Sequence, residues 1–308
     1  MPPGLLSQPQ GSPPRALRVR LMSVDLSLSG ADLSEQLLRE LEELAVTAAR
    51  EAGRFIVDER PRGLGVLDTK TSVNDIVTVM DQRSEALLRR RLLGARPDDA
   101  VLGEEDGASD GTSGITWVID PIDGTVNYLY EIPAYCVSVA AVIGDSGVPG
   151  QWKPVAGAIC NPLSGEVFHA RLGGGAHVLV VDEDTSIRVN SVDVLQQSLV
   201  ATGFGYVPEV RARQGEVLAA ILPEIRDIRR AGSAALDLCA VACGRVDAYY
   251  ESGLNPWDLA AGWIIATEAG ALVTGLGETG PGQAAVVTAG PGIHAPLLAR
   301  LEALAPLR

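Results

Sequence analysis

The segment WVIDPIDGTVNY, at positions 117–128, places two aspartates three residues apart directly after an apolar run. The carboxylates of Asp120 and Asp123 repel each other at this spacing, and removal from water makes the repulsion worse. Any fold that packs this run into its core must therefore place positive charge beside the two acids. This requirement limits the structures open to the chain more than any other feature of the sequence.

Acidic residues stand at two further junctions between predicted elements. The run GEED at 103–106 follows an apolar segment, and Asp258 opens an apolar helix after Pro-Trp. In α/β sheets ligands collect beyond the carboxyl ends of strands, so acids in such places indicate a binding site. Each also has a simpler interpretation: a solvated turn for GEED, a helix N-cap for Asp123, and a first-turn acid that interacts with the helix dipole for Asp258.

The acidic clusters favour a hard divalent cation. Carboxylate oxygens select Mg²⁺, Mn²⁺ or Ca²⁺ over Zn²⁺, and none of the three histidines lies in these clusters. A calcium loop of the EF-hand type starting at Asp120 would need Asp or Asn at its third position and Gly at its sixth, where the chain has Ile122 and Thr125. The phosphoaspartyl motif Asp-x-Asp-x-Thr fails as well, because the second aspartate comes one residue late.

Gly124 and Thr125 add a signal of another kind. A helical turn that begins there offers free backbone N–H groups and the positive end of the helix dipole, which suit an anion. Metal-binding carboxylates beside an anion site are typical of metal-assisted phosphoryl chemistry, in which two cations bridged by a phosphate activate a water and stabilise the leaving oxygen. The acid pair therefore predicts a divalent-metal site for a phosphorylated substrate.

The hydrophobic pattern predicts an α/β (α+β) chain in two halves that share a cleft. In the first half, two amphipathic helices precede closely spaced apolar segments, which indicates a mostly antiparallel sheet packed on the helices. In the second half strands and helices alternate, which indicates a layered α/β arrangement. The expected helices are 32–60, Thr78 to just before Pro97, 209–222, 233–243, 256–269 and 293–304. The expected strands are 100–102, 115–119, 135–143, 155–159, 167–170, 177–181, 198–202, 225–229, 246–250, 271–274 and 284–288. The expected divisions are a tail at 1–30, an N-terminal half at 31–190 with the main metal ligands and a C-terminal half at 191–308 with the substrate pocket.

Composition disfavours several functions. The net charge of −14 argues against nonspecific nucleic-acid binding and against an anionic membrane surface, and no apolar run reaches the roughly 20 residues that span a bilayer. Residues 1–30 are rich in Pro, Ser and Gly and lack the pattern of a secretory signal, so we expect a disordered tail, with Met22 as an alternative first residue. Cys239 and Cys243 are expected to pack in a core rather than bind a metal. A cytoplasmic location is expected.

Four ordered motifs resemble those of the inositol monophosphatase family, a branch of the lithium-sensitive, Mg²⁺-dependent phosphatases. They are KTSVNDIVTVMD (70–81), GEE (103–105), WVIDPIDGTVNY (117–128) and GSAALDLCAVACGRVDAYYESGLNPWDLAAG (232–262). The resemblance extends from about residue 32 to residue 303, and DPIDGT followed by WDLAAG is specific in this order. It implies a layered α-β-α-β-α sandwich and a phosphomonoester hydrolase.

The resemblance also implies roles for individual residues. Two or three Mg²⁺ ions are expected, with Mn²⁺ able to substitute and Li⁺ as an inhibitor. The implied metal ligands are Glu104, Asp120 and the carbonyl of Ile122 for one ion, and Asp120, Asp123 and Asp258 for the other. The implied catalytic residues are Thr125 and Asp81, which orient and deprotonate the attacking water, and Glu105, which supports that water or one on a third ion. Lys70 and Asp75 would stand behind the site.

The same resemblance implies a substrate pocket. Its implied residues are Gly124, Thr125, Gly232, Ser233, Ala234, Glu251 and Asp258. Among these, the amides of Gly124 and Thr125 would hold the phosphate and Glu251 would accept hydrogen bonds from inositol or sugar hydroxyls. A solvated acid at a strand end is the simpler interpretation of Glu251.

The segments GSAAL and DAYYESG favour inositol 1-phosphate as the substrate, hydrolysed to myo-inositol and phosphate. The alternatives are a broad-specificity sugar-phosphate, histidinol-phosphate or fructose-1,6-bisphosphate phosphatase, or a family member that also binds a transcription-factor partner. The resemblance further implies a homodimer.

Overall fold

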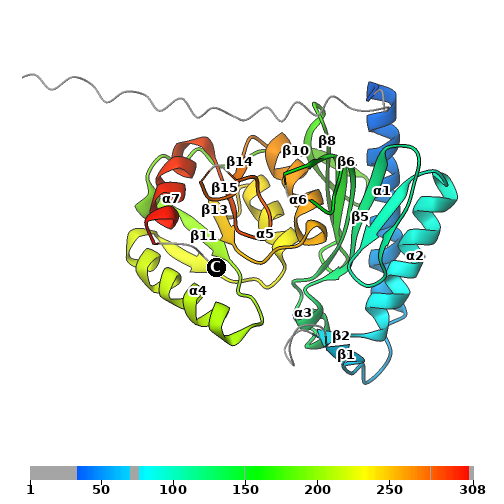
Figure 1. Cartoon of the computed structure of the whole chain (residues 1–308), viewed down its shortest axis with the longest axis horizontal. Coiled ribbons are helices and arrows are strands. Elements are labelled where there is room, and N and C mark those ends of the chain that lie inside the picture. Colours follow the sequence, from blue (N-terminus) through cyan, green and yellow to red (C-terminus); the bar gives the residue numbers. More distant parts are fainter. Residues whose placement is uncertain (1–32, 70–75, 149, 278, 305–308) are drawn as a thin grey trace, which may run out of the picture.

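The computed structural model describes residues 33–69, 76–148, 150–277 and 279–304, and arranges them in layers of helix, sheet, helix, sheet and helix (Figure 1). The helices are α1 (Glu35–Asp58), α2 (Val79–Ala95), α3 (Thr125–Leu129), α4 (Pro208–Ile221), α5 (Ala234–Ala242), α6 (Pro256–Glu268) and α7 (Pro291–Ala303), with short 3₁₀ turns at Leu195–Gln197 and Leu222–Glu224. The strands are β1 (Asp68–Thr69), β2 (Ile76–Val77), β3 (Ala100–Gly103), β4 (Gly107–Ser109), β5 (Ile115–Asp123), β6 (Cys136–Gly144), β7 (Trp152–Asn161), β8 (Glu166–Arg171), β9 (Gly175–Val180), β10 (Glu183–Ile187), β11 (Leu199–Thr202), β12 (Asp227–Arg229), β13 (Ala248–Glu251), β14 (Leu272–Thr274) and β15 (Val286–Ala289). The expected α-β-α-β-α sandwich is thereby confirmed.

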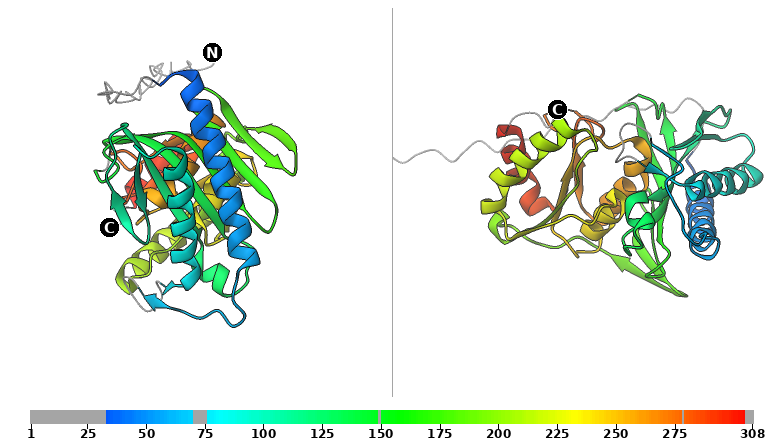
Figure 2. Two further views of the ribbon diagram at one scale, coloured as in Figure 1. Left: turned by 90° about the vertical axis from the view of Figure 1, so that its right-hand side faces the viewer. Right: turned by 90° about the horizontal axis from the view of Figure 1, so that it is seen from below.

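The helices α1 and α2 form the first outer layer (Figure 2). Ser34 caps α1 by accepting a hydrogen bond from the backbone N–H of Leu37 (3.2 Å), and one face of the helix is buried from Leu38 to Ile56. α1 lies across β6, β7 and β8, and α2 lies across β5. The apolar stripe of α1 therefore covers the large sheet, as the helical periodicity predicts.

The large sheet has eight strands in the order β10-β9-β8-β7-β6-β5-β3-β4. Its neighbouring strands are antiparallel except for β3 and β5, which run parallel with Gly103 beside Ile119. Side chains of β5 alternate between two cores: Trp117 and Ile119 face the outer helices, whereas Val118 faces the middle layer. Because β5 is buried on both faces, it reads as a continuous apolar run up to the acid pair.

The middle layer consists of α5 and α6, which lie between the large sheet and a five-stranded sheet of order β12-β11-β13-β15-β14. α6 can approach the large sheet closely because its facing side chains are small: a Cβ on Gly157 of β7 would lie 3.0 Å from the Cα of Ala261. Gly262 allows α5 an equally close approach, since a Cβ there would overlap the side chain of Leu238. The WDLAAG motif is therefore a packing motif as well as the carrier of Asp258.

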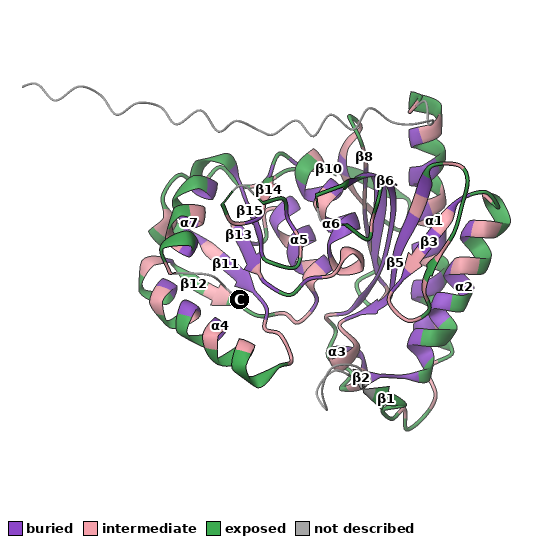
Figure 3. Ribbon diagram, viewed as in Figure 1, coloured by how far each residue is buried: buried purple, intermediate pink, exposed green. Residues whose placement is uncertain are grey.

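The last layer consists of α4 and α7, whose buried residues join the core on the far side of the small sheet. Burial is concentrated in the two sheets and in the helices between them, while the outward faces of α1, α4 and α7 are exposed (Figure 3). The middle core combines residues from both predicted halves, such as Val118 and Ile264. The division near residue 190 stays a prediction. None of the described helices is both long and apolar enough to cross a membrane.

The structure contains strands that the hydrophobic pattern did not predict. β10 is an exposed edge strand with the sequence EDTSI, which lacks the apolar alternation of a half-buried strand. β1, β2 and β4 are only two or three residues long, too short for any pattern. The predicted strand at 225–229 is shorter than expected: only Asp227–Arg229, which form β12, pair with β11. Lys70 and Asp75 lie outside the described residues.

Candidate active site

Acids from separate elements meet at one edge of the large sheet. Because β3 and β5 are parallel neighbours, the acids that follow β3 and those that end β5 emerge at the same edge. The N-terminal end of α6 brings Asp258 to Asp120 and Asp123, and one carboxylate oxygen of each lies within 4.8 Å of the other two. Asp120 is 1% exposed and Asp123 is 8% exposed, so most of this cluster is removed from water.

The acids of the cluster resist ionising together. Burial raises the pKa of Asp123, although hydrogen bonds from Ser233 and from the backbone of Ala235 oppose the change. The pKa of Asp258 lies well above its usual range, first because of burial and then because of the negative charges of Glu104 and Asp123. A cation bound among these carboxylates would offset the cost of keeping them ionised. It would supply the positive charge that the acid pair in the sequence requires.

Asp123 is oriented by hydrogen bonds to one of its two oxygens. Its Oδ2 accepts from Ser233 Oγ (2.6 Å) and from the backbone N–H of Ala235 (2.8 Å). Ser233 also caps α5 by accepting from the backbone N–H of Leu236 (3.3 Å). The hydroxyl expected to line the substrate pocket thus positions a site carboxylate. The alternative interpretation of Asp123 as an N-cap is wrong, because Gly124 caps α3.

A break in the pairing of β5 with β6 shapes the turn between the two aspartates. The register shifts between Asp120 and Asp123, around Pro121, whose missing N–H suits a bulge. Ile122 donates its backbone N–H to Asp120 Oδ1 (3.0 Å), and Ser84 of α2 donates to the Pro121 carbonyl (3.2 Å). These bonds hold the Asp120 carboxylate and the backbone of the short turn that leads to Asp123.

Thr125 and Asp81 form a hydrogen-bonded pair beside the acids. Thr125 Oγ1 lies 3.1 Å from Asp81 Oδ1 and 3.0 Å from the carbonyl of Ile122. Asp81 Oδ2 accepts from the backbone N–H (2.8 Å) and the hydroxyl (2.6 Å) of Thr78, in the capping box that begins α2. With Asp81 held in this way, Thr125 can donate its proton to Asp81 and accept one from a neighbouring water.

The GEE turn is anchored by a residue that the sequence analysis did not single out. Glu85 of α2 is buried and accepts from the backbone N–H groups of Glu105 (2.8 Å) and Asp106 (3.0 Å). Arg89 balances its charge at 2.8 Å, and Gly103 leaves room for it, since a Cβ there would overlap the Glu85 carboxylate. The signal available in the sequence was an acid on the apolar face of the predicted helix.

Two glycines with left-handed backbone lie beside the cluster. Gly124 has φ 93°, and a Cβ there would lie 2.9 Å from the carbonyl of Ala134. Gly232 has φ 94°, and a Cβ there would lie 2.9 Å from Asn127 Nδ2. Asn127 joins the two loops by donating to the carbonyls of Ala134 (2.7 Å) and Ala231 (2.8 Å). Any other residue at either glycine would be strained.

Glu251 reaches the site from the end of β13. Tyr249 donates its hydroxyl to Glu251 Oε2 (2.6 Å). Burial raises the pKa of Glu251 to about 7, while the Tyr249 bond and the charge of Arg230 lower it. Glu251 is therefore not the fully solvated acid of the simpler interpretation.

Asp237 of α5, which the sequence analysis did not single out, belongs to the same group of charges. Burial and the charge of Glu251 raise the pKa of Asp237 to about 8.

The structure also places the predicted residues Ala234, Glu104 and Glu105. Ala234 begins α5, and its backbone N–H also lowers the pKa of Asp123. Glu104 is near enough to Asp258 to raise its pKa, whereas Glu105 is placed by its backbone bond to Glu85. The structure thus supplies a common location for the predicted ligands, and their roles stay predictions.

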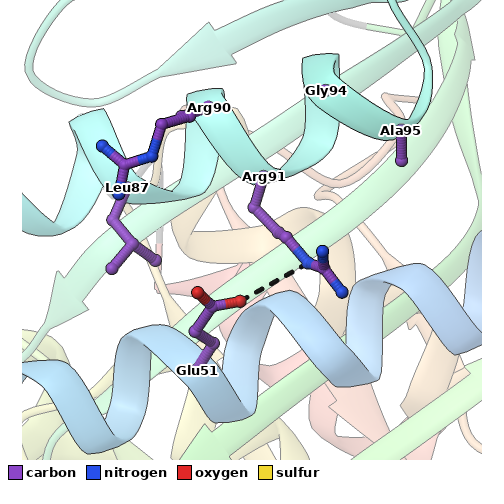
Figure 4. Close-up of a pocket in the computed structure, with 6 residues that line it drawn as sticks. All are labelled: Glu51, Leu87, Arg90, Arg91, Gly94 and Ala95. Carbon is purple, nitrogen blue, oxygen red and sulfur yellow. Dashed lines mark ion pairs between the residues drawn. The ribbon is translucent and has the colours of Figure 1, made fainter.

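A groove elsewhere on the molecule is separate from this site. It lies between α1 and the C-terminal half of α2, and Glu51 and Arg91 form an ion pair in it at 3.4 Å (Figure 4). Its lining residues are Glu51, Leu87, Arg90, Arg91, Gly94 and Ala95. Neither the acid cluster nor the Thr125–Asp81 pair contributes to this groove.

Comparisons with known proteins agree with the fold. Inositol-1-monophosphatase SuhB of Mycobacterium tuberculosis is 46% identical over 267 residues, which cover 85% of this chain and 90% of the relative. The inositol-1-monophosphatase of Mycobacterium leprae is 47% identical over 288 residues, covering 89% of this chain and 97% of the relative. A Vibrio cholerae protein named Nus factor SuhB is 36% identical over 233 residues, which cover 75% of this chain and 83% of the relative. The solved structure of Mycobacterium tuberculosis SuhB superposes with a TM-score of 0.74 at 44% identity, covering 88% of this chain and 98% of that one.

The chain is therefore a phosphatase. It belongs to the inositol monophosphatase family, whose model matches residues 37–305.

Proposed function

We propose that this phosphatase is a Mg²⁺-dependent inositol-1-monophosphatase, which hydrolyses inositol 1-phosphate to myo-inositol and phosphate. The observation that carries the proposal is the Thr125–Asp81 pair beside the cluster of Asp120, Asp123 and Asp258. The pair offers a proton acceptor and the cluster offers a cation site, and attack of water on a phosphomonoester is assisted by both.

The side chains of the cluster fit Mg²⁺. The converging side-chain atoms are carboxylate oxygens, the ligands that Mg²⁺ and Mn²⁺ prefer. The raised pKa values of Asp123 and Asp258 reflect burial without a counter-charge, which a divalent ion would supply. When bound, the ions would stabilise the negative charge on the attacking and leaving oxygens. The expected ligands are Glu104, Asp120 and the Ile122 carbonyl for one ion, and Asp120, Asp123 and Asp258 for the other.

Thr125 and Asp81 receive the proton of the attacking water. Thr125 Oγ1 accepts this proton as it passes its own to Asp81 Oδ1, which lies 3.1 Å away. The water oxygen forms a bond to phosphorus, the ester bond to the inositol oxygen breaks, and that oxygen takes a proton from solvent as it leaves. Asp81 keeps its orientation because Thr78 holds its other oxygen. Glu105 is expected to support the same water.

The pocket side of the site favours a polyol ester. The amides of Gly124 and Thr125 would hold the phosphate, and Gly232, Ser233 and Ala234 would line the pocket. The Glu251 carboxylate would accept hydrogen bonds from inositol hydroxyls. The names of the two mycobacterial relatives support this choice of substrate.

A phosphate-release panel with Mg²⁺ tests the proposal. The esters are inositol 1-phosphate, fructose 1,6-bisphosphate, histidinol phosphate, adenosine 3′,5′-bisphosphate and glycerol 2-phosphate. We expect the highest kcat/KM for inositol 1-phosphate, and loss of activity in chelator. Glu251→Gln should raise KM for inositol 1-phosphate by roughly ten- to a hundred-fold, because a charged hydrogen bond contributes about 1.5–3 kcal/mol. A higher kcat/KM for another ester would contradict inositol 1-phosphate as the substrate and would identify the class of that ester instead.

A second role as a binding partner of the transcription machinery is the alternative. The relative named Nus factor SuhB, at 36% identity, is the observation that favours it. A pull-down with this chain as bait tests the role: recovery of transcription proteins would support it, and their absence would leave the hydrolase as the proposed function. The expected homodimer is measured in the same preparation by sedimentation.

A further inference from the structure

We propose that Tyr249 is a positioning residue for substrate recognition, and that its hydroxyl fixes the Glu251 carboxylate in the orientation that accepts hydrogen bonds from the polyol. The inference rests on the proposed function, since it concerns how the same pocket selects its substrate. It assigns a purpose to a fully buried tyrosine that belongs neither to the acid cluster nor to the Thr125–Asp81 pair.

The strand geometry of β13 produces the contact between the two side chains. Residues two apart on a strand point to the same face, so Tyr249 and Glu251 share the face that looks toward α5 and α6. Tyr250 points to the opposite face and packs in the core beside α4 and α7. Tyr249 therefore lies behind Glu251, and its hydroxyl donates to Oε2 at 2.6 Å.

The neighbouring strand closes the other side of the carboxylate. β11 runs parallel to β13 with Thr202 beside Tyr250, so Gly203 lies next to Glu251 in the register. A Cβ on Gly203 would overlap the Glu251 carboxylate. Glu251 thus lies against the backbone at Gly203, in space that only a glycine leaves open. With Tyr249 on Oε2 and Gly203 alongside, the carboxylate is held before substrate binds.

A carboxylate held in this way binds a hydroxyl better than a freely rotating one. Ordering a rotamer-rich side chain on binding lowers affinity, and the Tyr249 bond removes part of that loss. The bond also favours the charged form of Glu251, which is the stronger acceptor, because Tyr249 lowers the pKa that burial raises. Without the tyrosine hydroxyl, the carboxylate loses both its orientation and part of its charge.

The experiment compares two tyrosine variants of the full chain. The readout is the ratio of kcat/KM for inositol 1-phosphate to kcat/KM for p-nitrophenyl phosphate, with Mg²⁺ present. This ratio is independent of the amount of folded enzyme, because both substrates use the same active fraction. Tyr249→Phe should lower it by about tenfold, mainly through KM for inositol 1-phosphate. Tyr250→Phe is the matched control, since it removes the same atom from the next residue on the opposite face, and it should leave the ratio unchanged.

A double-mutant comparison decides whether Tyr249 acts through Glu251. In the Glu251→Gln background, Tyr249→Phe should change the ratio by less than twofold or so, because the two residues form one unit. Equal ratios for Tyr249→Phe and Tyr250→Phe, with a reduced ratio for Glu251→Gln, would overturn the inference and leave the proposed function intact. A ratio that Glu251→Gln does not change would overturn the inference together with the proposed role of Glu251, because Glu251 would then bind no substrate hydroxyl, while the proposed function itself is decided by the ester panel.

Discussion

Three carboxylates of the site, those of Asp81, Asp123 and Asp258, are anchored to the protein through Oδ2. Oδ2 of Asp81 caps α2 through Thr78, and Oδ2 of Asp258 accepts from the backbone N–H of Asn255 (2.7 Å) to cap α6. Oδ2 of Asp123 is held by Ser233. The interpretation of Asp258 as a first-turn acid of α6 is therefore correct, and it is compatible with a place in the site. In Asp123 and Asp258 the other oxygen can serve a ligand, whereas Oδ1 of Asp81 accepts from Thr125.

Asp123→Asn tests the charge of one such residue. The amide can keep the bond from Ser233 through its oxygen, but its NH₂ group would then face the cation and carry no negative charge. We expect kcat with Mg²⁺ to fall by at least about a hundredfold, with the fold intact. The measurements are kcat and melting temperature on pure protein, with Asp110→Asn, at an exposed acid, as the control. A kcat like that of the unmodified chain would contradict the role of Asp123.

The pH dependence of the chelated protein tests Asp237. Its folded pKa of about 8 lies above the value of 3.8 for an exposed aspartate, so the folded state binds the proton more tightly. This residue therefore destabilises the metal-free fold above pH 8, and the loss is relieved as pH falls through 8 toward 4. Asp237→Asn, which cannot ionise, should raise the melting temperature in chelator more at pH 9 than at pH 6. An equal change at both pH values would contradict the raised pKa.

At the scale of elements, α6 joins the two sheets and carries a site acid. Its residues Ala261 and Gly262 are small because β7 and α5 lie against them at close range. The capping box at its N-terminus then places Asp258 at the edge where β5 ends. The position of the acid therefore depends on how closely this helix packs.

Gly157→Val tests that dependence. The added side chain would meet the backbone of Ala261 and push α6 away from β7. Overpacking of a core costs about 1–3 kcal/mol, and the displaced Asp258 should also weaken Mg²⁺ binding. The measurements are melting temperature in chelator and the Mg²⁺ concentration for half-maximal activity. Gly94→Ala, at an exposed site of α2 with open space around it, should be neutral or slightly stabilising. Unchanged values for Gly157→Val would show that α6 is not packed so closely.

At the scale of the whole molecule, the site lies where the large sheet, α6 and the small sheet come together. Glu251 of the small sheet and Asp123 of the large sheet influence each other's charge. Repulsion among these acids opposes the docking of the two sheets, so a cation bound at the site would stabilise the entire fold.

Mg²⁺ should therefore stabilise the chain as a whole. A ligand that binds only the native state adds about 2.7 kcal/mol at a hundred times its Kd. For a domain of this size that corresponds to a rise in melting temperature of about 5 °C. We expect this rise between chelator and millimolar Mg²⁺, and a smaller one for Asp123→Asn. A melting temperature that is constant across this range of Mg²⁺ would contradict a metal site at these acids.

The sequence by itself determined the features that arise from local patterns. The apolar stripe of α1 predicts a helix that covers a sheet, and the apolar run before Asp120 predicts a buried strand that ends in acids. Capping residues mark the starts of α2 and α6 within a residue or two. The ordered motifs identified the family, and the oxygen-rich clusters predicted a divalent-metal site. Hydrogen bonding and side-chain periodicity within a few residues are enough for the helix and strand predictions, whereas the family came from the resemblance of the motifs.

Only the tertiary structure decided which residues meet. The parallel pairing of β3 with β5 brings GEE to the edge where Asp120 and Asp123 lie, although the pattern indicated a mostly antiparallel sheet. The bonds of Glu85 to the GEE turn and of Ser233 to Asp123 join segments remote in the chain. The period of a strand reveals its buried face but neither its neighbour nor its register. Those are set by the packing of whole layers, which is why the support of the site could not be read from the motifs that form it.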